Sequence, residues 1–137
     1  MYDSLFTELR FRIGEQYELN EFNLKSIEST FISGIEYENY EYIKNDFKAL
    51  FGVEFSSNIV LQYNADILSG IIYNLDIMGV DSFIQGLNKH LSFSKKLISD
   101  KLDFSQTIDI LNFKEVSITI YIDKVISLKV FKTLGQT

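Results

Sequence analysis

The most constraining feature of this chain of 137 residues is an alternation of apolar and polar side chains near its C-terminal end. It runs from Val116 to Val130 and is interrupted at Asp123-Lys124-Val125. Side chains of a β-strand point alternately to two faces, so this pattern predicts two strands that each have one apolar face. The inward-facing residues are then Val116, Ile118, Ile120, Ile122, Ile126, Leu128 and Val130.

The length of the turn between these strands can be argued from burial. A two-residue turn at Asp123-Lys124 would place Ile120 opposite Ser127 and mix the two faces. A three-residue turn instead pairs Ile122 with Ile126 and keeps every apolar side chain on one face. Residues 107–112 add a third strand, so the sequence predicts an antiparallel β-meander.

The first two-thirds of the chain has a different period. Apolar residues recur there at spacings of three and four, and a glycine follows most of these runs, as is common at helix ends. This pattern predicts helices over 3–14, 23–34, 38–52, 67–79 and 81–91. The secondary structure of residues 53–63 is left undecided by the sequence. Alternation of Val53, Phe55 and Ile59 favours a strand, whereas the segment can also begin the helix that follows.

These elements predict an α+β fold, with a mainly helical N-terminal two-thirds packed against a C-terminal antiparallel β-meander of three or more strands. A sheet of this kind needs its apolar face covered, and the preceding helices are the available cover. The length fits one domain, and no proline, Gly/Ser tract or repeat marks a linker. We therefore expect residues 1–137 to form a single domain.

Several kinds of chemistry are excluded by composition. The chain has no cysteine, which rules out disulfides, thiolate metal sites and cysteine nucleophiles. Its one histidine, His90, cannot form a His-pair metal site, and we expect it to lie at a helix end. The glycines form neither a dinucleotide-binding motif nor a P-loop. We expect no catalytic residue, no metal, no cofactor and no enzymatic activity.

Residues 1–6 lack the basic and apolar regions of a secretory signal. The most apolar stretch, residues 67–78, is too short and too polar to span a bilayer. We therefore expect a soluble cytoplasmic protein with no membrane contact. Heavy use of Ile, Asn, Lys, Phe and Tyr suggests an AT-rich bacterial or phage gene.

Charge is unevenly distributed along the chain. Residues 1–54 carry a net charge of −6, residues 55–88 carry −3 and residues 89–137 carry +3. The C-terminal lysines are scattered, whereas nucleic-acid binding needs a concentrated basic face. We expect no nucleic-acid partner.

One acidic segment stands out. Residues 13–43 hold seven glutamates against one base, Lys25. Two interpretations compete: the tyrosines pack in the core while the glutamates stay solvated, or both form a recognition surface. Tyrosine gives large contact area at low rotamer cost, and carboxylates attract a basic partner. The predicted partner-binding residues are Glu36, Tyr37, Glu38, Tyr40, Glu41 and Tyr42.

The leading hypothesis is a non-enzymatic acidic protein that neutralises a basic protein partner by steric and electrostatic occlusion. An immunity or inhibitor protein for a bacterial nuclease-type toxin fits this description. The alternatives are a protein that self-associates through an edge of the Val116–Val130 sheet, and a small-molecule-binding domain with an aromatic pocket between helices and sheet. The sequence leaves open whether the protein is a monomer or a dimer.

Overall fold

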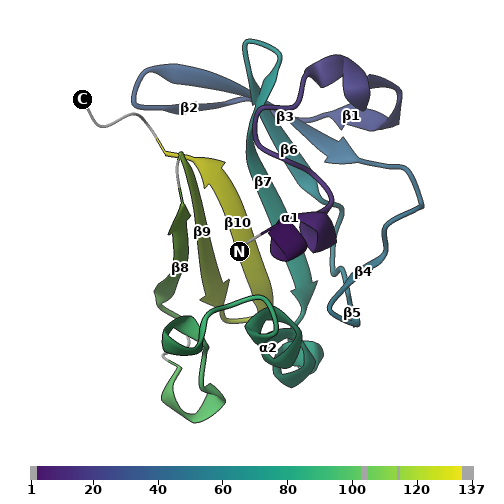
Figure 1. The fold of residues 1–137 in the computed structure, drawn as a ribbon. Coiled ribbons are helices and arrows are strands. Elements are labelled where there is room, and N and C mark those ends of the chain that lie inside the picture. Colours follow the sequence, from purple (N-terminus) through teal and green to yellow (C-terminus); the bar gives the residue numbers. More distant parts are fainter. Residues whose placement is uncertain (1–2, 103–104, 114, 134–137) are drawn as a thin grey trace.

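The computed structural model of the chain describes residues 3–102, 105–113 and 115–133. Its main element is an eight-stranded antiparallel sheet in the order β1-β3-β6-β7-β10-β9-β8, in which β2 also pairs with β3 (Figure 1). The strands are β1 (Leu24–Ser26), β2 (Thr30–Ile32), β3 (Ile35–Tyr42), β6 (Val60–Asn64), β7 (Ile67–Asp76), β8 (Thr107–Phe113), β9 (Val116–Ile122) and β10 (Val125–Lys132).

Smaller elements complete the described chain. The helices are α1 (Asp3–Leu9) and α2 (Val80–Asn88), and a separate hairpin consists of β4 (Ala49–Leu50) and β5 (Val53–Glu54). Single 3-10 turns are η1 (Tyr17–Leu19), η2 (Glu21–Asn23), η3 (Ile77–Gly79), η4 (Phe93–Lys95) and η5 (Ser99–Lys101).

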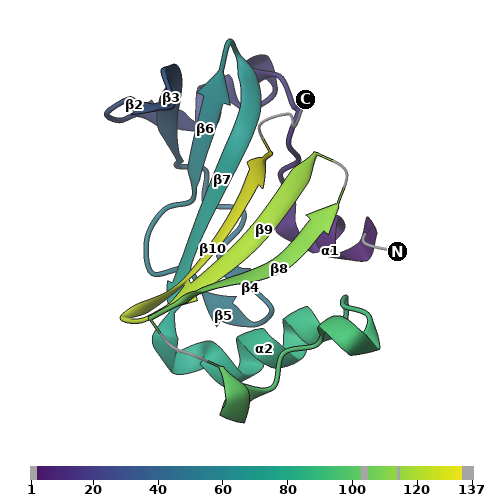
Figure 2. The same cartoon turned by 90° about the vertical axis from the view of Figure 1, so that its left-hand side faces the viewer.

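The hydrophobic core lies on one face of the sheet. α1, α2 and the β4–β5 hairpin lie on this side, as the two ribbon views show (Figures 1 and 2). These elements contribute Leu5, Leu9, Leu50, Val53, Phe83, Ile84 and Leu87, all of which are buried. The inward residues of β6, β7, β9 and β10 meet them in one continuous cluster. The sheet is therefore covered on one side by three short elements that come from distant parts of the chain.

The C-terminal meander has the predicted register. Ile126 pairs with Ile122, Leu128 with Ile120 and Val130 with Ile118, and β8 adds the third strand beside β9. All six of these side chains are at most 2% exposed. Burial of a single apolar face thus selected the three-residue turn.

The prediction of a mainly helical N-terminal two-thirds is wrong. Of the five predicted helices, those near residues 3–14 and 81–91 form as α1 and α2, the first ending at Leu9. The segments predicted as helices over 23–34, 38–52 and 67–79 instead hold strands, mainly β1 to β4 and β7. The protein is mostly β-sheet, with two short α-helices in the described residues.

A β-bulge explains the misleading period in β7. The register between β6 and β7 shifts after Gln62, so Tyr63 pairs with Leu68 while Gln62 pairs with Gly70. Leu68 and Ile71 are consequently both buried although they are three residues apart. A bulge adds one residue to a strand and reverses its alternation. The resulting spacing of buried residues imitates that of a helix.

Turn geometry explains the other two segments. Ser33 and Gly34 both have positive φ, and so do Phe51 and Gly52. These pairs are the two-residue turns of the β2–β3 and β4–β5 hairpins, and positive φ at both positions is what type I′ turns require. A glycine with positive φ also ends many helices, so these glycines were assigned to the wrong element.

Two further expectations are settled by the topology. Residues 53–63 form β5 and the start of β6, in agreement with the strand interpretation. The Val116–Val130 segment is not an edge: β10 lies between β7 and β9, and β9 lies between β10 and β8. Neither β9 nor β10 therefore offers a free edge for self-association, and the edge strand of the meander is β8.

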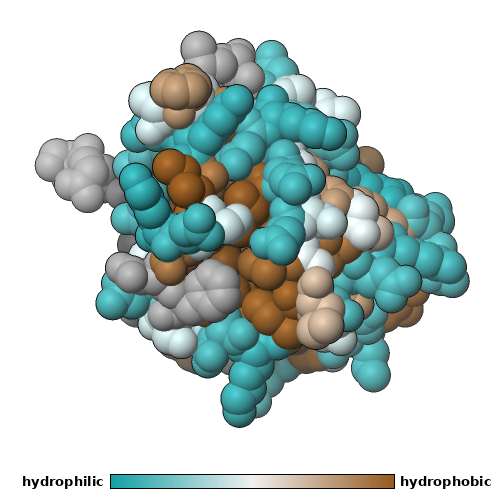
Figure 3. All heavy atoms as spheres, turned by 90° about the horizontal axis from the view of Figure 1, so that it is seen from below, coloured by the Kyte–Doolittle hydropathy of each residue, from teal (hydrophilic) through white to brown (hydrophobic). Residues whose placement is uncertain are grey.

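No helix within the described ranges has the length and apolar character needed to cross a membrane. The lower end of the molecule nevertheless exposes hydrophobic side chains, which Figure 3 shows in the middle of the view from below. Met78 in η3, Phe93 in η4 and Ile98 after it are the large apolar residues exposed in this part of the chain.

Two glycines let the β4–β5 hairpin approach the α2 region closely. A Cβ on Gly79 would lie 2.6 Å from a methyl carbon of Val53, and one on Gly86 would lie 2.5 Å from Cβ of Phe51. Gly79 and Gly86 are seven residues apart, which is about two helical turns, so they share a face. The hairpin packs directly on the backbone at these points.

We predict that Gly86→Ala destabilises the protein by about 1–3 kcal/mol, because overpacking of this size outweighs the gain of up to about 1 kcal/mol in helix propensity. Phe51 cannot withdraw easily, since its backbone is fixed in the hairpin turn. Equilibrium unfolding in urea measures the change. Gln85→Ala, at the exposed neighbouring position, is the control and is expected to be near neutral. An increase in stability for Gly86→Ala would contradict the close approach.

Candidate interaction surface

The six predicted partner-binding residues all lie on β3, and its alternation divides them between the two faces of the sheet. Glu36, Glu38, Tyr40 and Tyr42 are on the face that carries the core, and Tyr37 and Glu41 are on the other. In the predicted helix, by contrast, residues three and four apart would share a face. The structure thus does not bring the six side chains together in one surface.

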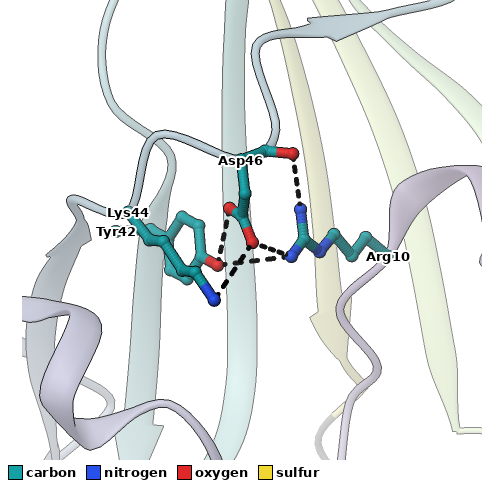
Figure 4. Close-up of polar contacts among 4 residues, drawn as sticks. All are labelled: Arg10, Tyr42, Lys44 and Asp46. Carbon is teal, nitrogen blue, oxygen red and sulfur yellow. Dashed lines mark hydrogen bonds and ion pairs between the residues drawn. The ribbon is translucent and has the colours of Figure 1, made fainter.

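Tyr42 is a core residue whose hydroxyl belongs to a polar cluster at the surface, since Arg10, Lys44 and Asp46 are exposed. Its hydroxyl donates to Oδ1 of Asp46 at 2.9 Å, and its ring packs edge-on against Phe11. Arg10 pairs with the same carboxylate, Lys44 lies 3.7 Å from it, and the Arg10 guanidinium lies over the Tyr42 ring (Figure 4). The hydrogen bond from Arg10 lowers the pKa of Asp46. Tyr42 therefore joins the segment after α1 to the loop after β3.

Tyr40 packs in a group of three aromatic rings. The centroids of Tyr17, Tyr40 and Tyr63 are separated by 5.3 to 5.8 Å. The Tyr40 hydroxyl donates to Oε2 of Glu38 at 3.0 Å. Burial, and then this hydrogen bond, raises the pKa of Tyr40. Through this hydrogen bond Tyr40 holds the Glu38 carboxylate in place. Its half-buried side chain is only partly available to a partner.

The three predicted glutamates have different surroundings. Glu36 and Glu38 are exposed on the core-bearing face, beyond the point where the core ends. Glu41 is half-buried on the opposite face and accepts a hydrogen bond from Nδ2 of Asn58 at 2.8 Å. Glu36 and Glu38 can therefore meet one partner, whereas Glu41 faces elsewhere.

The rest of the acidic segment folds at the same end of the sheet. We call this region the acidic end and define it by Glu18, Glu21, Glu28, Glu36 and Glu38 together with the exposed apolar residues Leu19, Phe22 and Phe31. The segment of η1 and η2 lies on one side of it and the β2–β3 hairpin on the other (Figure 1). Phe22 is 91% exposed and Phe31 is 72% exposed. The ion pairs within the described residues are those of Asp46, so none of these five glutamates is neutralised there.

The apolar residues of the acidic end were missed by sequence reasoning. Phe31 falls within residues 23–34, which were predicted as a helix, but it lies on β2 directly opposite Glu36. A signal was present: a two-residue hairpin at Ser33-Gly34 pairs Ile32 with Ile35 and therefore Phe31 with Glu36. Phe22, between Glu21 and Asn23, carried no comparable signal.

His90 lies just after α2, as expected, and its Nδ1 is 2.8 Å from Oγ of Ser4. Its ring also packs near that of Phe51. Within the described residues no carboxylate is hydrogen-bonded to His90, so this pair lacks the third member of a catalytic triad. No group of three potential metal ligands occurs in the same ranges.

We predict delayed ionisation of the buried tyrosines at high pH. Burial raises the pKa of Tyr63 to about 12 and that of Tyr73 well above its ordinary value. Folding favours the neutral phenols, so their contribution to stability is complete below pH 10 and is lost as the pH rises through the raised pKa values. Tyrosinate absorbance followed together with circular dichroism should show that these residues ionise only as the protein unfolds.

The control for this titration is Tyr63→Phe combined with Tyr73→Phe, which should remove part of the late absorbance change and leave the early part. Ionisation of every tyrosine near pH 10, with a native circular dichroism spectrum, would contradict the burial of these hydroxyls.

Comparison with known proteins gives no relative from which a role could be transferred. No family model, no curated protein and no solved structure matches the chain. The function is therefore inferred from the geometry and charge of the acidic end.

Proposed function

We propose that this protein is a non-enzymatic binding protein that neutralises a basic protein partner through its acidic end. The finer proposal is an immunity or inhibitor protein that acts in the cytoplasm against a bacterial nuclease-type toxin. The observation that carries the proposal is the combination, on one end of the sheet, of five glutamates without an ion pair among the described residues and exposed phenylalanines.

The charge of this end supports rapid capture of a basic partner. Unpaired carboxylates create a negative field that steers a positively charged surface during diffusional encounter. The field of exposed charges is screened by salt, with a Debye length of about 8 Å at physiological ionic strength. Association should consequently slow as salt is added.

The exposed aromatic rings support stable binding after encounter. Large apolar side chains that fill a pocket on the partner contribute much of the binding energy in protein interfaces, and surrounding polar contacts exclude water. Phe31 lies beside Glu36 on the paired strands β2 and β3, so its backbone is held in place before binding. A preorganised anchor loses less conformational entropy on binding than a flexible one.

A nuclease-type partner is the class that this chemistry fits best. Enzymes that act on nucleic acid carry basic surfaces for the phosphate backbone. Glutamate carboxylates can accept hydrogen bonds from the same Arg and Lys side chains. A protein bound there would cover the site and exclude the substrate.

We predict that Glu36→Gln together with Glu38→Gln slows association with the partner several-fold at low salt, because two steering charges are removed. The partner is first obtained by retention on the immobilised wild-type protein from an extract of the source cells. Association and dissociation rates are then measured with the purified pair, together with the partner's nuclease activity. Phe31→Ala should act differently, by accelerating dissociation.

Glu41→Gln is the control on the same strand but the opposite face, and it removes one carboxylate where the double variant removes two. It should leave the association rate nearly unchanged. Equal rates for the wild type and the double variant at low salt would remove the acidic end from the mechanism. A retained partner whose activity is not inhibited would leave binding intact but reject the inhibitor role.

A further inference from the structure

The sheet face opposite the core has a groove that the proposed function does not use. It lies beside the β2–β3 hairpin and over β7 and β10, and its volume is about 520 Å³. Small-molecule sites commonly have volumes of about 300–1,000 Å³. The groove is lined by Ile32, Tyr37, Ile72, Lys129, Phe131 and Lys132, among others.

A glycine beside the groove determines where the Gln62 side chain lies. Gly70 on β7 pairs with Gln62 on one side and with Phe131 on the other, so a side chain is missing between two long ones. A Cβ at this position would lie 2.5 Å from Oε1 of Gln62, whose side chain thus extends over the glycine. The Gln62 side chain therefore occupies the space over Gly70, and the groove lies beside it against Ile72 and Phe131.

The next row of the sheet adds a positive charge to this groove. Lys129 on β10 pairs directly with Ile72 on β7, so both project on the same face. Lys132 also borders the groove, but it follows Phe131 in β10, so its side chain alternates to the core-bearing face. Neither ammonium forms an ion pair with a carboxylate among the described residues. On a chain with a net charge of −6, the groove is a local site of the opposite sign.

We propose that this groove binds a small carboxylate with an apolar body. The apolar body lies against Ile72 and Phe131, beside the Gln62 side chain, and the carboxylate meets Lys129. The hydroxyl of Tyr37 and the amide of Gln62 are the further hydrogen-bonding groups at the rim. This site is distinct from the acidic end, because Tyr37 alternates with Glu36 and Glu38 along β3 and points to the other face.

The experiment uses two fluorescent probes that differ mainly in charge. 1-Anilinonaphthalene-8-sulfonate carries an anionic group, whereas N-phenyl-1-naphthylamine has the same rings without it. The native protein should bind the anionic probe saturably and more tightly than the neutral one. Decanoate should displace the anionic probe, and decanol should displace it less well.

Three variants locate the site. Lys129→Gln should weaken binding of the anionic probe by up to about fivefold, as expected for one exposed charge contact, whereas Lys132→Gln, on the core-bearing face, should change it little. Gly70→Val, which takes the space that the Gln62 side chain occupies and so forces this side chain of the groove to move, should weaken both probes. Lys124→Gln, in the turn before β10, is the control and should have no effect. Retained circular dichroism and melting temperature show that each variant is folded.

Three results would overturn the proposal: equal binding of the charged and neutral probes, no effect of Lys129→Gln and Gly70→Val, or no saturable binding. Loss of probe binding in Phe93→Ser but not in Gly70→Val would also overturn it and would place the probe at the lower end of the molecule instead. Binding to a basic protein partner is measured separately and is unaffected by any of these results.

Discussion

The burial of one face of β7 and β10 is the constraint on which the rest of the structure depends. Both strands are paired along each edge, so their backbones are satisfied, and their inward side chains must be removed from water. α1, α2 and the β4–β5 hairpin supply the cover, although each is short. The hairpin reaches the α2 region because Gly79 and Gly86 leave it room. A small set of close contacts thus replaces the layer of long helices that the sequence pattern indicated.

The limit of this cover determines where the acidic end begins. Along one face of β3, Tyr42 is buried, Tyr40 is half-buried, and Glu38 and Glu36 are exposed. The same face changes from core to surface over four alternate positions, because α1 and the segment after it extend no further. β2 and the turns around Phe22 continue the sheet beyond the core, which leaves their apolar rings in water. Exposed rings beside unpaired carboxylates are what a basic protein partner requires.

The parts of the fold that could be predicted from sequence are those where one physical requirement acts alone. In β9 and β10 the apolar alternation is uninterrupted, so strand, turn length and register all followed from burial. In β7 a bulge at Gly70 shifts the alternation and produces helix-like spacing. At Gly34 and Gly52 positive φ is compatible with either a helix end or a hairpin turn. The pairing of the strands on either side decides between the two. The candidate site was misjudged for the same reason, since helical spacing grouped residues that a strand separates.

Period-two alternation also explains how a small sheet can present two chemically different surfaces. Glu36 and Glu38 extend the acidic end, whereas Tyr37, between them, lines the groove beside Lys129. Glu36 and Glu38 on one face and Lys129 on the other are kept apart by the sheet itself, so they do not neutralise one another. This separation maintains a negative field at one surface and a positive site at the other. Because the two sets of side chains share only the backbone of β3, changes in one set can leave the other intact.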